Sequence, residues 1–389
     1  MKRKKIAFIV QHLTNGGAEK TVCNLSFIMA KKYDIYLIVF DGKNITYDYD
    51  GELIDLELPP RKTKIGKVVN FIDRTRKVKK IKKKYNFDVV ISFMFGANII
   101  NVISRKKEKV IISTRNYMSA FGTDPISVFK EKYTGKKCDY DVALSRMVAY
   151  DLEHNFKVPR EKIVAIYNPC EVDKIEKKSK EKPDFLFSHN KYYFITAGRL
   201  TKQKGQWHLI KAFYKFNQKY KSSELIIMGI GELDEKLKEL SKQLGIYDKV
   251  HFLGFVDNPY KYISNSSCFV FPSLFEGLGN ALVETMACGT PIISYDCLAG
   301  PRELISPDSK ITDTTIGFEV AKHGILVEPC DNSMDFSSEL SKDDNNLYKA
   351  MIYAYEHSKD FKKCAVNAHE FVKRFNAESI LKDWERLFH

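Results

Sequence analysis

Short apolar runs alternate along the chain with longer stretches in which apolar residues recur every three or four positions. The first run, residues 6–10, is apolar at every position, which is typical of a strand buried on both faces of a parallel sheet. After it, Ala18, Val22, Leu25 and Met29 recur at helical spacing and predict a helix with one apolar face. Further strands of this first half are predicted at residues 35–40, 89–93, 110–113, 142–145 and 163–167.

A polar segment separates two such halves. The pair Asn168-Pro169 interrupts the alternation, and residues 174–183 are rich in Lys and Glu, which predicts a linker between two domains. Strands of the second half are expected at residues 192–197, 225–228, 250–253, 268–271 and 291–294. A helix between the first two of these has an apolar face made of Leu209, Ile210, Phe213 and Phe216. The stretch after about residue 360 is predicted to be helical.

The alternation in both halves predicts an α/β fold with two Rossmann-like domains, each a doubly wound parallel sheet. The length of 389 residues agrees with this, because one hydrophobic core rarely serves more than about 250–300 residues. We expect the first domain at residues 1–175 and the second at 188–365, followed by a helical segment at 366–389. Parallel sheets bind ligands at the carboxyl ends of their strands, so two facing sheets would hold two substrates in an interdomain cleft.

The composition agrees with a globular protein that stays inside the cell. Apolar residues make up 44% and charged residues 29% of the chain, so disorder is not expected. No run approaches the roughly 20 apolar residues that span a bilayer, and the apolar run after the basic N-terminus is too short for a signal peptide. The eight cysteines form no CxxC pair and no zinc-like spacing, which favours buried free thiols and predicts no metal site.

The net charge of +14 is concentrated in one stretch of the first half. From Arg61 to Lys84 there are twelve Lys or Arg residues against one acid, Asp73. A stripe at helical spacing runs through it, at Val68, Phe71, Ile72, Thr75 and Val78. Such a basic amphipathic helix favours contact with an anionic membrane surface, and a solvated helix packed on the first domain is the alternative. No RNA- or DNA-binding motif accompanies the charge, so nucleic acid is not an expected partner.

The most specific motif lies at residues 271–294, where a strand leads through a glycine-rich turn into a helix. Gly277 and Gly279 let the backbone approach a ligand closely, and N–H groups at the helix start can hold phosphate or sugar oxygens. Glu276 stands just before the turn and can accept hydrogen bonds from sugar hydroxyls, whereas Glu284, inside the helix, can reach a ribose diol. A plain strand–helix crossover with two exposed glutamates is the alternative.

A second motif, at residues 196–206, joins a strand end to a helix through Gly198. Arg199 and Lys204 follow this glycine, and two cations at the carboxyl end of a strand suit the diphosphate of a leaving group. No Asp-x-Asp triplet lies in this half of the chain to bind a divalent metal, so the two cations are expected to take its place. The alternative is a basic surface loop.

A third motif follows the first strand, where Gly16 and Gly17 open a helix in the string Thr-Asn-Gly-Gly-Ala-Glu-Lys. The glycine spacing differs from that of the dinucleotide fingerprint G-x-G-x-x-G. A helix start of this kind can lie against a phosphate or a sugar, although a tight turn would explain the two glycines equally well.

The string from Glu276 to Pro291, with its glycine-rich turn, second acid and Cys-Gly-Thr-Pro ending, resembles the donor-binding signature of the retaining glycosyltransferases of family 4, which have the GT-B fold. The resemblance extends over nearly the whole chain. It implies that Arg199 and Lys204 stabilise the departing diphosphate. It also implies that Glu276 binds the donor sugar, that Glu284 binds the nucleotide ribose, and that the C-terminal helix returns to the first domain. Further donor contacts are implied at Gly16, Gly17, Gly198, Gly229, Gly277, Leu278, Gly279 and Asn280.

One position departs from the family pattern. Many relatives place a histidine near the reacting carbon, after a strand like residues 89–93, and this chain has none there. Candidates on the acceptor side are therefore His12, Asn98 and Arg115, each of which follows a predicted strand of the first domain. The sequence does not decide which of them assists the acceptor hydroxyl.

The sequence thus predicts a retaining, metal-independent glycosyltransferase, of hexosyl or N-acetylhexosaminyl type, that needs no cofactor beyond its nucleotide-sugar co-substrate. We expect a UDP-sugar donor, with GDP as the alternative, and a polysaccharide or lipid-linked glycan acceptor, as in capsule or lipopolysaccharide synthesis. The protein is expected in the cytoplasm, or peripheral on the inner face of the cell membrane. The other function classes are a nucleotide-sugar epimerase of the same fold and a non-enzymatic basic protein that binds membrane or nucleic acid.

Overall fold

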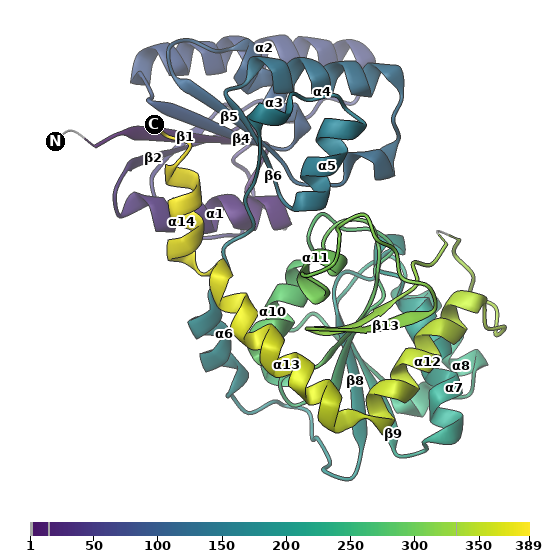
Figure 1. Cartoon of the computed structure of the whole chain (residues 1–389). Helices are drawn as coiled ribbons and strands as arrows, with labels where there is room; N and C mark the ends of the chain where they lie inside the picture. The colour runs from purple at the N-terminus through teal and green to yellow at the C-terminus, as the bar shows by residue number, and fades with distance from the viewer. Residues whose placement is uncertain (1–2, 15, 332) are drawn as a thin grey trace. The chain divides into compact units, whose positions relative to one another are not determined.

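The chain forms two compact units. The computed structural model describes residues 3–14, 16–331 and 333–389. Unit 1 comprises Met1–Pro169 and Ala377–His389, and unit 2 comprises Cys170–Asn376. Each unit is built on its own β-sheet, with helices on both faces (Figure 1).

The division between the units falls slightly before the polar segment at residues 174–183. Much of that segment forms helix α6 (Val172–Ser179), which buries Val172 and Ile175 beneath a charged surface. Its Lys- and Glu-rich composition therefore reflects the solvated side of a short helix rather than an extended linker.

The sheet of unit 1 is parallel, with the strand order β3-β2-β1-β4-β5-β6-β7. The central strands β1 and β4 are buried at nearly every position, which explains why their sequences are apolar except for Lys5 and Ser92. The strands are β1 (Lys5–Val10), β2 (Asp34–Val39), β3 (Glu52–Asp55), β4 (Val89–Phe93), β5 (Lys109–Thr114), β6 (Tyr140–Ala143) and β7 (Ile163–Ala165).

One face of this sheet is covered by helices from both ends of the chain (Figure 1). α1 (Gly17–Ala30) contributes Leu25 and Met29, and α14 (Ala377–Glu385) contributes Trp384, to a hydrophobic cluster with β1, β2 and β4. α14 therefore completes the core of unit 1, although the whole of unit 2 separates it from the rest of unit 1 in the sequence.

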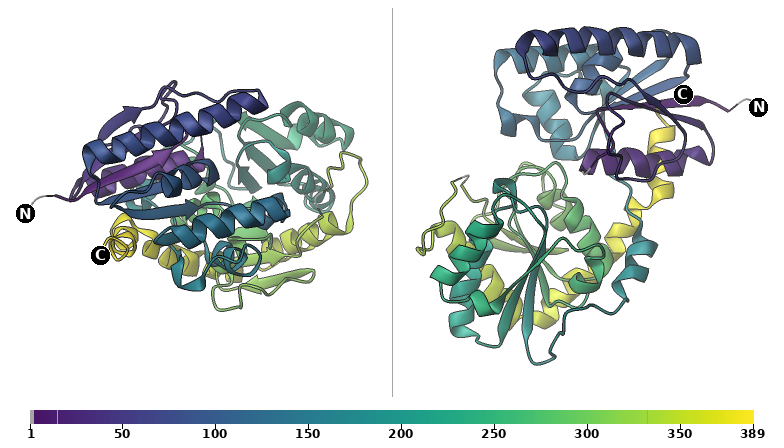
Figure 2. Two further views of the ribbon diagram at one scale, coloured as in Figure 1. Left: turned by 90° about the horizontal axis from the view of Figure 1, so that it is seen from above. Right: turned by 180° about the vertical axis from the view of Figure 1, so that it is seen from behind.

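The opposite face of the sheet carries α2 (Lys64–Tyr85), α3 (Phe95–Ile103) and α4 (Pro125–Lys137) (Figure 2). Val102 of α3 and Cys138 at the end of α4 pack on β5. None of the described helices has both the length and the apolar character needed to cross a membrane. The remaining helical segments of unit 1 are η1 (Met118–Phe121), α5 (Arg146–His154) and η2 (Arg160–Lys162).

The predicted single apolar stripe along α2 is wrong. Phe71 and Val78 belong to the hydrophobic cluster beneath the helix, whereas Val68 and Ile72 are exposed. The helix therefore has two apolar faces, one packed on the sheet and one open to solvent, and helical spacing alone does not separate them.

The sheet of unit 2 has the order β10-β9-β8-β11-β12-β14-β13. Its pairings are parallel except that β13 forms an antiparallel pair with β14. β3 of unit 1 and β13 are not predicted from the sequence pattern, because these edge strands carry polar residues such as Glu52, Asp55 and Glu319. β14 is not predicted either, although it is buried at every position. The strands are β8 (Tyr192–Ala197), β9 (Ser223–Met228), β10 (Val250–Gly254), β11 (Cys268–Phe271), β12 (Ile292–Tyr295), β13 (Phe318–Ala321) and β14 (Gly324–Val327).

Helices also cover both faces of the second sheet (Figure 1). On one face, Phe213 and Phe216 are fully buried among strand residues, which confirms the predicted apolar face of their helix. The helices on this face are α7 (Gln206–Lys219), α8 (Asp234–Gln243) and α12 (Lys342–Glu356). The other side carries α9 (Tyr260–Ile263), α10 (Asn280–Cys288) and α13 (Ser358–Val372), and α11 (Pro301–Ile305) follows β12.

Candidate functional site

The carboxyl edge of the unit 2 sheet brings together turns that are far apart in the sequence. The turn after β8 starts at Gly198, and the turn after β9 starts at Gly229. The two backbones are in contact, since a Cβ added to Gly229 would lie 1.9 Å from the Gly198 carbonyl oxygen. Gly229 also has a φ of +137°, so this position requires glycine. The contact holds the turn after β8, which carries Arg199 and Lys204, against the turn after β9.

Lys204 and Glu276 form an ion pair at this edge, although 72 residues separate them in the sequence. Lys204 lies in the short helix η3 (Lys202–Lys204), and Glu276 lies in the turn after β11. The Lys204 ammonium donates a hydrogen bond to the Glu276 carboxylate and lies 5.4 Å from the centre of the Phe271 ring. The two side chains keep 18% and 10% exposure, so both can still meet a ligand.

Arg199 lies on the same turn as Lys204, with its side chain exposed. In the described part of the chain, its guanidinium has no hydrogen-bond or ion-pair partner. Its backbone carbonyl accepts a hydrogen bond of 3.0 Å from Nε2 of Gln206, the buried first residue of α7. The backbone of Arg199 is therefore held in place while its charge remains available to an anion.

Helix α10 starts directly after the glycine-rich turn. Its N-cap is Gly279, which has a φ of +88° and no side chain that could cap the helix. Leu278 is buried, whereas Gly277 is half-buried and Asn280 is exposed. Backbone N–H groups at an open helix start favour phosphate or sugar oxygens. The turn therefore has the form that an anion site at a helix start requires.

Glu284 lies in the second turn of α10 and is paired with a residue that the sequence pattern does not single out. Burial, and next the negative charge of Glu284, raise the pKa of Tyr260 in α9. A hydrogen bond between the Tyr260 hydroxyl and Glu284 adds to this rise in the tyrosine pKa. The bond orients the carboxylate, which remains half-buried.

Two further turns at this edge are missed by sequence reasoning. Gly254 ends β10, and its carbonyl oxygen accepts a hydrogen bond of 2.7 Å from the Gly229 N–H. Ile230 and Phe255, the residues after these two glycines, are exposed apolar side chains. After β12, Gly300 packs against the backbone of the glycine-rich turn. The rule that ligands bind at the carboxyl ends of parallel strands could have selected both turns.

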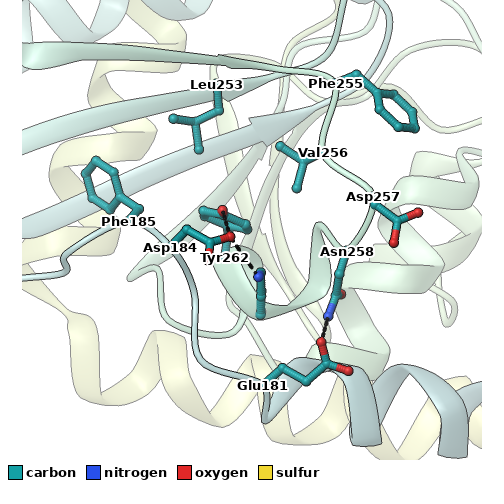
Figure 3. Close-up of a pocket in the computed structure, with 10 residues that line it drawn as sticks. Glu181, Asp184, Phe185, Leu253, Phe255, Val256, Asp257, Asn258 and Tyr262 are labelled. Atoms are coloured by element: carbon teal, nitrogen blue, oxygen red, sulfur yellow. Dashed lines mark hydrogen bonds and ion pairs between the residues drawn. The ribbon is translucent and has the colours of Figure 1, made fainter.

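A cavity of about 480 Å³ lies beside the end of β10, between α9 and the segment that follows α6 (Figure 3). Its lining includes three acids, Glu181, Asp184 and Asp257, and one cation, Lys261. The Lys261 ammonium donates to Asp184 over 3.0 Å, so its charge is already compensated. This acidic lining is unsuitable for a diphosphate, which the turn with Arg199 would attract.

In unit 1, the carboxyl edge of the sheet carries the start of α1. Gly16 is the N-cap of this helix and Gly17 is its first residue, while Asn15 lies outside the described residues. The Glu19 carboxylate folds back over Gly16, where an added Cβ would lie 2.0 Å from Glu19 Oε2. His12 Nδ1 lies 3.6 Å from Glu19 Oε1. The helix start is thus covered by an acid that must move before a phosphate can bind there.

Asn98 is buried, and both the oxygen and the nitrogen of its side-chain amide form hydrogen bonds within unit 1. Its Oδ1 accepts a hydrogen bond of 2.9 Å from the Ser92 hydroxyl, and its Nδ2 donates to the Ser113 carbonyl over 3.2 Å. These bonds tie α3 to β4 and β5, so the geometry gives Asn98 a supporting role.

Arg115 follows β5 and is buried without a carboxylate partner among the described residues. Its guanidinium donates to the Asn168 side chain and to the Ser113 hydroxyl, and lies 5.5 Å from the centre of the Phe93 ring. Burial lowers the pKa of Arg115 to about 9, and its Nε finds no hydrogen-bond partner in the described part of the chain. A guanidinium in this state retains the capacity to bind an anionic group.

The turn after β4 contains a strained residue. Met94 has a φ of +72°, which non-glycine residues rarely adopt, directly before α3. Strained backbone tends to occur at functional turns. Sequence reasoning has no signal for it, because methionine is not a residue that prefers this conformation.

Both units match models of known families. Residues 15–174 match the model for Glycosyltransferase Family 4, and residues 177–357 match the model for Glycosyl transferases group 1. The two matches together cover most of the chain.

Two similar curated proteins are glycosyltransferases that align with this chain over nearly their whole length. An uncharacterized glycosyltransferase of Methanocaldococcus jannaschii is 33% identical over 377 residues, which is 92% of this chain and 93% of that protein. The N-acetylgalactosamine-N,N'-diacetylbacillosaminyl-diphospho-undecaprenol 4-alpha-N-acetylgalactosaminyltransferase of Campylobacter jejuni is 29% identical over 358 residues, which is 89% of this chain and 92% of that protein.

A solved structure has the same fold. HepE of Anabaena, in complex with UDP, superposes with a TM-score of 0.76 at 17% sequence identity, and the alignment covers 98% of both chains. The likeness confirms the predicted architecture of two parallel-sheet α/β domains.

Proposed function

This chain belongs to the glycosyltransferases of the GT-B fold, and from that membership we propose that unit 2 binds a nucleotide-diphosphate sugar, preferably a UDP-sugar, and donates its sugar. One observation carries the proposal. The ion pair between Lys204 and Glu276 lies at the carboxyl edge of the unit 2 sheet, where Arg199 has no partner among the described residues and α10 has an open start. The UDP bound to HepE supports uridine over guanosine.

In the proposed complex, Arg199, Lys204 and the N–H groups at the start of α10 bind the oxygens of the diphosphate. Glu276 contacts the sugar hydroxyls from the other side of Lys204. Glu284, oriented by Tyr260, accepts hydrogen bonds from the ribose. The nucleobase lies along the turn that starts at Gly229. Gly198 and Gly277 to Asn280 provide close backbone contacts.

The proposed reaction retains the configuration of the sugar. The bond between the anomeric carbon and the diphosphate oxygen breaks, the bond to the acceptor oxygen forms on the same face, and the acceptor proton passes to the departing diphosphate. Glu276 is ion-paired with Lys204, which suits it to binding rather than to attack on the anomeric carbon. The two cations compensate the charge that develops on the leaving group, and we assign them the role that a divalent metal has in other transferases.

We propose that the acceptor is a lipid-linked glycan and that unit 1 binds it. The relative from Campylobacter jejuni is named for an acceptor joined to undecaprenol through a diphosphate. Arg115 and His12 are the acceptor-side residues that we retain, together with Gly16 and Gly17 at the start of α1. Asn98 supports the turn that precedes them. The transferred sugar is proposed to be a hexose or an N-acetylhexosamine.

The proposed place of work is the inner surface of the cell membrane, where a lipid-linked acceptor is found. The basic stretch from Arg61 to Lys84 is the proposed electrostatic contact to anionic lipid. No nucleic acid is part of the proposal.

Thermal unfolding in the presence of nucleotide sugars tests this function. A ligand that binds the native state raises its melting temperature, so UDP and one or more UDP-sugars should stabilise the protein while GDP-sugars do not. Transfer of the selected sugar to a diphospholipid-linked glycan should then follow. Conversion of the donor sugar without any acceptor would instead indicate an epimerase, and stabilisation by neither UDP nor GDP would contradict the proposal.

A further inference from the structure

The outer face of α2 changes character along the helix. Ile65 is 79% exposed and Val68 is 60% exposed, and Val69 and Ile72 are exposed beside them. Their spacing of three and four residues places all four on one face of the first two turns. The same face continues through the exposed cations Arg76, Lys79, Lys80 and Lys83. The face is therefore apolar where the helix begins and basic where it ends.

The outer face of α4 repeats this combination. Ile126 and Phe129 are 64% and 68% exposed, and Tyr133 is exposed one turn later. The rings of Phe129 and Tyr133 stack with centres 6.5 Å apart. Lys130 and Lys137 lie on the same face, because each follows one of these residues, Ile126 or Tyr133, by one helical turn.

Acids are few on both outer faces: the partly exposed Asp73 lies at the edge of the α2 face, and the exposed Asp124 is the N-cap of α4. The one acidic residue in the sequence of α4, Glu131, is turned inward and is 2% exposed, and burial raises its pKa to about 8. On α2, Lys82 does pair with an acid, Glu108, but both side chains are buried beneath the helix. Within the described residues, the cations on the two outer faces form no ion pair with a carboxylate, although the charge of Lys130 acts on Asp124. The exposed charge on these two faces is thus predominantly positive.

The two outer faces point away from the same side of the unit 1 sheet. α2 contacts α3, and α3 contacts α4. Val90 beneath α2 and α3 pairs in register with Val110 beneath α3 and α4, so the three helices share one face of the sheet. Figures 1 and 2 show them as one layer over unit 1.

We infer that these outer faces of α2 and α4 together form a docking surface for an anionic lipid bilayer, into which Ile126 and Phe129 of α4 and Ile65 and Val68 of α2 insert. Apolar side chains enter the boundary between headgroups and acyl chains, and the lysines around them reach the phosphates. Lysine is depleted at protein interfaces, whereas anionic headgroups attract it. The inference rests on the proposed function at a membrane, and it adds α4 as a second, inserting contact beside the basic stretch of α2.

Co-sedimentation with vesicles tests this surface. The full chain should bind vesicles made of equal parts of phosphatidylglycerol and phosphatidylcholine, and should bind pure phosphatidylcholine vesicles much more weakly. The α4 variant Ile126→Ser with Phe129→Ser should lose roughly tenfold or more in affinity for the anionic vesicles, because apolar burial is removed while every cation remains. The α2 variant Ile65→Ser with Val68→Ser should show a loss of similar size.

A matched control removes equally exposed apolar side chains elsewhere. Leu186 and Ile316 of unit 2 are 87% and 89% exposed, so Leu186→Ser with Ile316→Ser should bind anionic vesicles as the parent chain does. Unchanged binding by the α4 variant overturns the inference. So does a parent chain that self-associates in solution and is made monomeric by the same substitutions, because the surface would then fit a second copy.

Stabilisation by UDP is measured on the same samples and separates the two proposals. Variants that lose vesicle binding but keep the UDP-induced rise in melting temperature support the inference and show that they are folded. A chain that binds vesicles as described but no UDP contradicts the proposed donor and leaves the docking surface supported.

Discussion

Lys204 shows how single residues prepare the donor site before a donor binds. Its ammonium lies between the Glu276 carboxylate and the face of the Phe271 ring. Both neighbours attract a cation, so the side chain loses less conformational freedom when a diphosphate binds than a free surface lysine would. Such preorganisation is the usual source of charge stabilisation in active sites.

Replacing Lys204 should therefore remove catalysis without unfolding the protein. For Lys204→Ala we expect kcat to fall by about 10²–10³, since one charge that acts on the leaving group is lost. Lys202→Ala is the matched control, because Lys202 lies in the same short helix with an exposed side chain. Steady-state kinetics with circular dichroism measure both effects. Equal turnover of the two variants would contradict the role of Lys204.

A second group of residues couples stability to pH. Glu131 and Asp141 are buried in unit 1, and each has one carboxylate oxygen without a hydrogen-bond partner among the described residues. Burial, with the nearby charges of Asp141 and Asp151, raises the pKa of Glu131 from 4.5 to about 8. Burial raises the pKa of Asp141 from 3.8 to about 7, against the hydrogen bond from Thr114. Both groups bind protons more tightly in the folded than in the unfolded chain.

Unit 1 should therefore lose stability as the pH rises. A raised folded pKa contributes stability that is present below the unfolded pKa and is lost as the pH passes the folded value, here about 7 to 8. Glu131→Gln should melt above the parent at about pH 9 and near it at about pH 5. The exposed Glu161→Gln is the control, with equal effects at both values. A parent chain whose melting temperature is constant over this range would refute the account.

At the scale of elements, the contact between the turns after β8 and β9 determines where Arg199 and Lys204 lie. Gly229→Ala places a Cβ 1.9 Å from the Gly198 carbonyl oxygen, so the turn must shift. We expect UDP affinity to fall by about tenfold or more, because the cations move with the turn.

Gly245→Ala is the control for this substitution. Gly245 also has a positive φ, +68°, but nothing lies within 4 Å of the added Cβ. It should therefore cost about 1 kcal/mol of stability and leave UDP affinity unchanged. Calorimetric titration measures the affinity of both variants. Similar affinities would mean that the turn contact does not position the site.

Uniform burial favours the prediction of an element but does not guarantee it, because the fully buried strand β14 is not predicted. β4, β8 and β11 are predicted to the residue, because most of their positions are buried and their sequences are apolar except for Ser92 and Thr196. The sequence pattern does not predict the edge strands β3 and β13, since solvent on one side permits polar residues. The sequence analysis takes the two apolar faces of α2 as one stripe for a related reason. Helical spacing shows which residues share a face, but not which face packs on the protein.

Site prediction depends on whether the chemistry is local in the sequence. Arg199, Lys204 and Glu276 can be selected from the turns in which they occur, because glycine and charge lie together there. The ion pair between Lys204 and Glu276 cannot be predicted from the sequence, since it joins turns after two different strands. Tyr260 is not selected for the same reason, as its partner Glu284 lies on another helix. The burial of Arg115 follows from packing and has no local signal.

At the scale of the whole molecule, the chain leaves unit 1, forms all of unit 2 and returns in α14. Trp384 of α14 is 1% exposed within the core of unit 1. Trp384→Ala should destabilise unit 1 by about 3–5 kcal/mol, the usual cost of a large cavity in a core. The surface variant Lys382→Ala should have little effect, because it removes only an exposed ion pair.

Scanning calorimetry with and without UDP distinguishes the unfolding transitions of the two units. The Trp384→Ala variant should lower the transition that UDP does not affect, while the transition that UDP raises stays where it is. If the melting temperature of the UDP-sensitive transition alone fell, α14 would stabilise unit 2 and not unit 1, which would contradict the prediction.

In the proposed function, the donor diphosphate binds between Arg199 and Lys204 at the carboxyl edge of the unit 2 sheet. A crystal structure of the chain with UDP, grown in the presence of EDTA, would locate the diphosphate. We expect diphosphate oxygens within hydrogen-bond distance of the Arg199 guanidinium and the Lys204 ammonium, next to the start of α10. UDP bound at another place in unit 2, or UDP that binds only when a divalent metal is restored, would contradict the proposal.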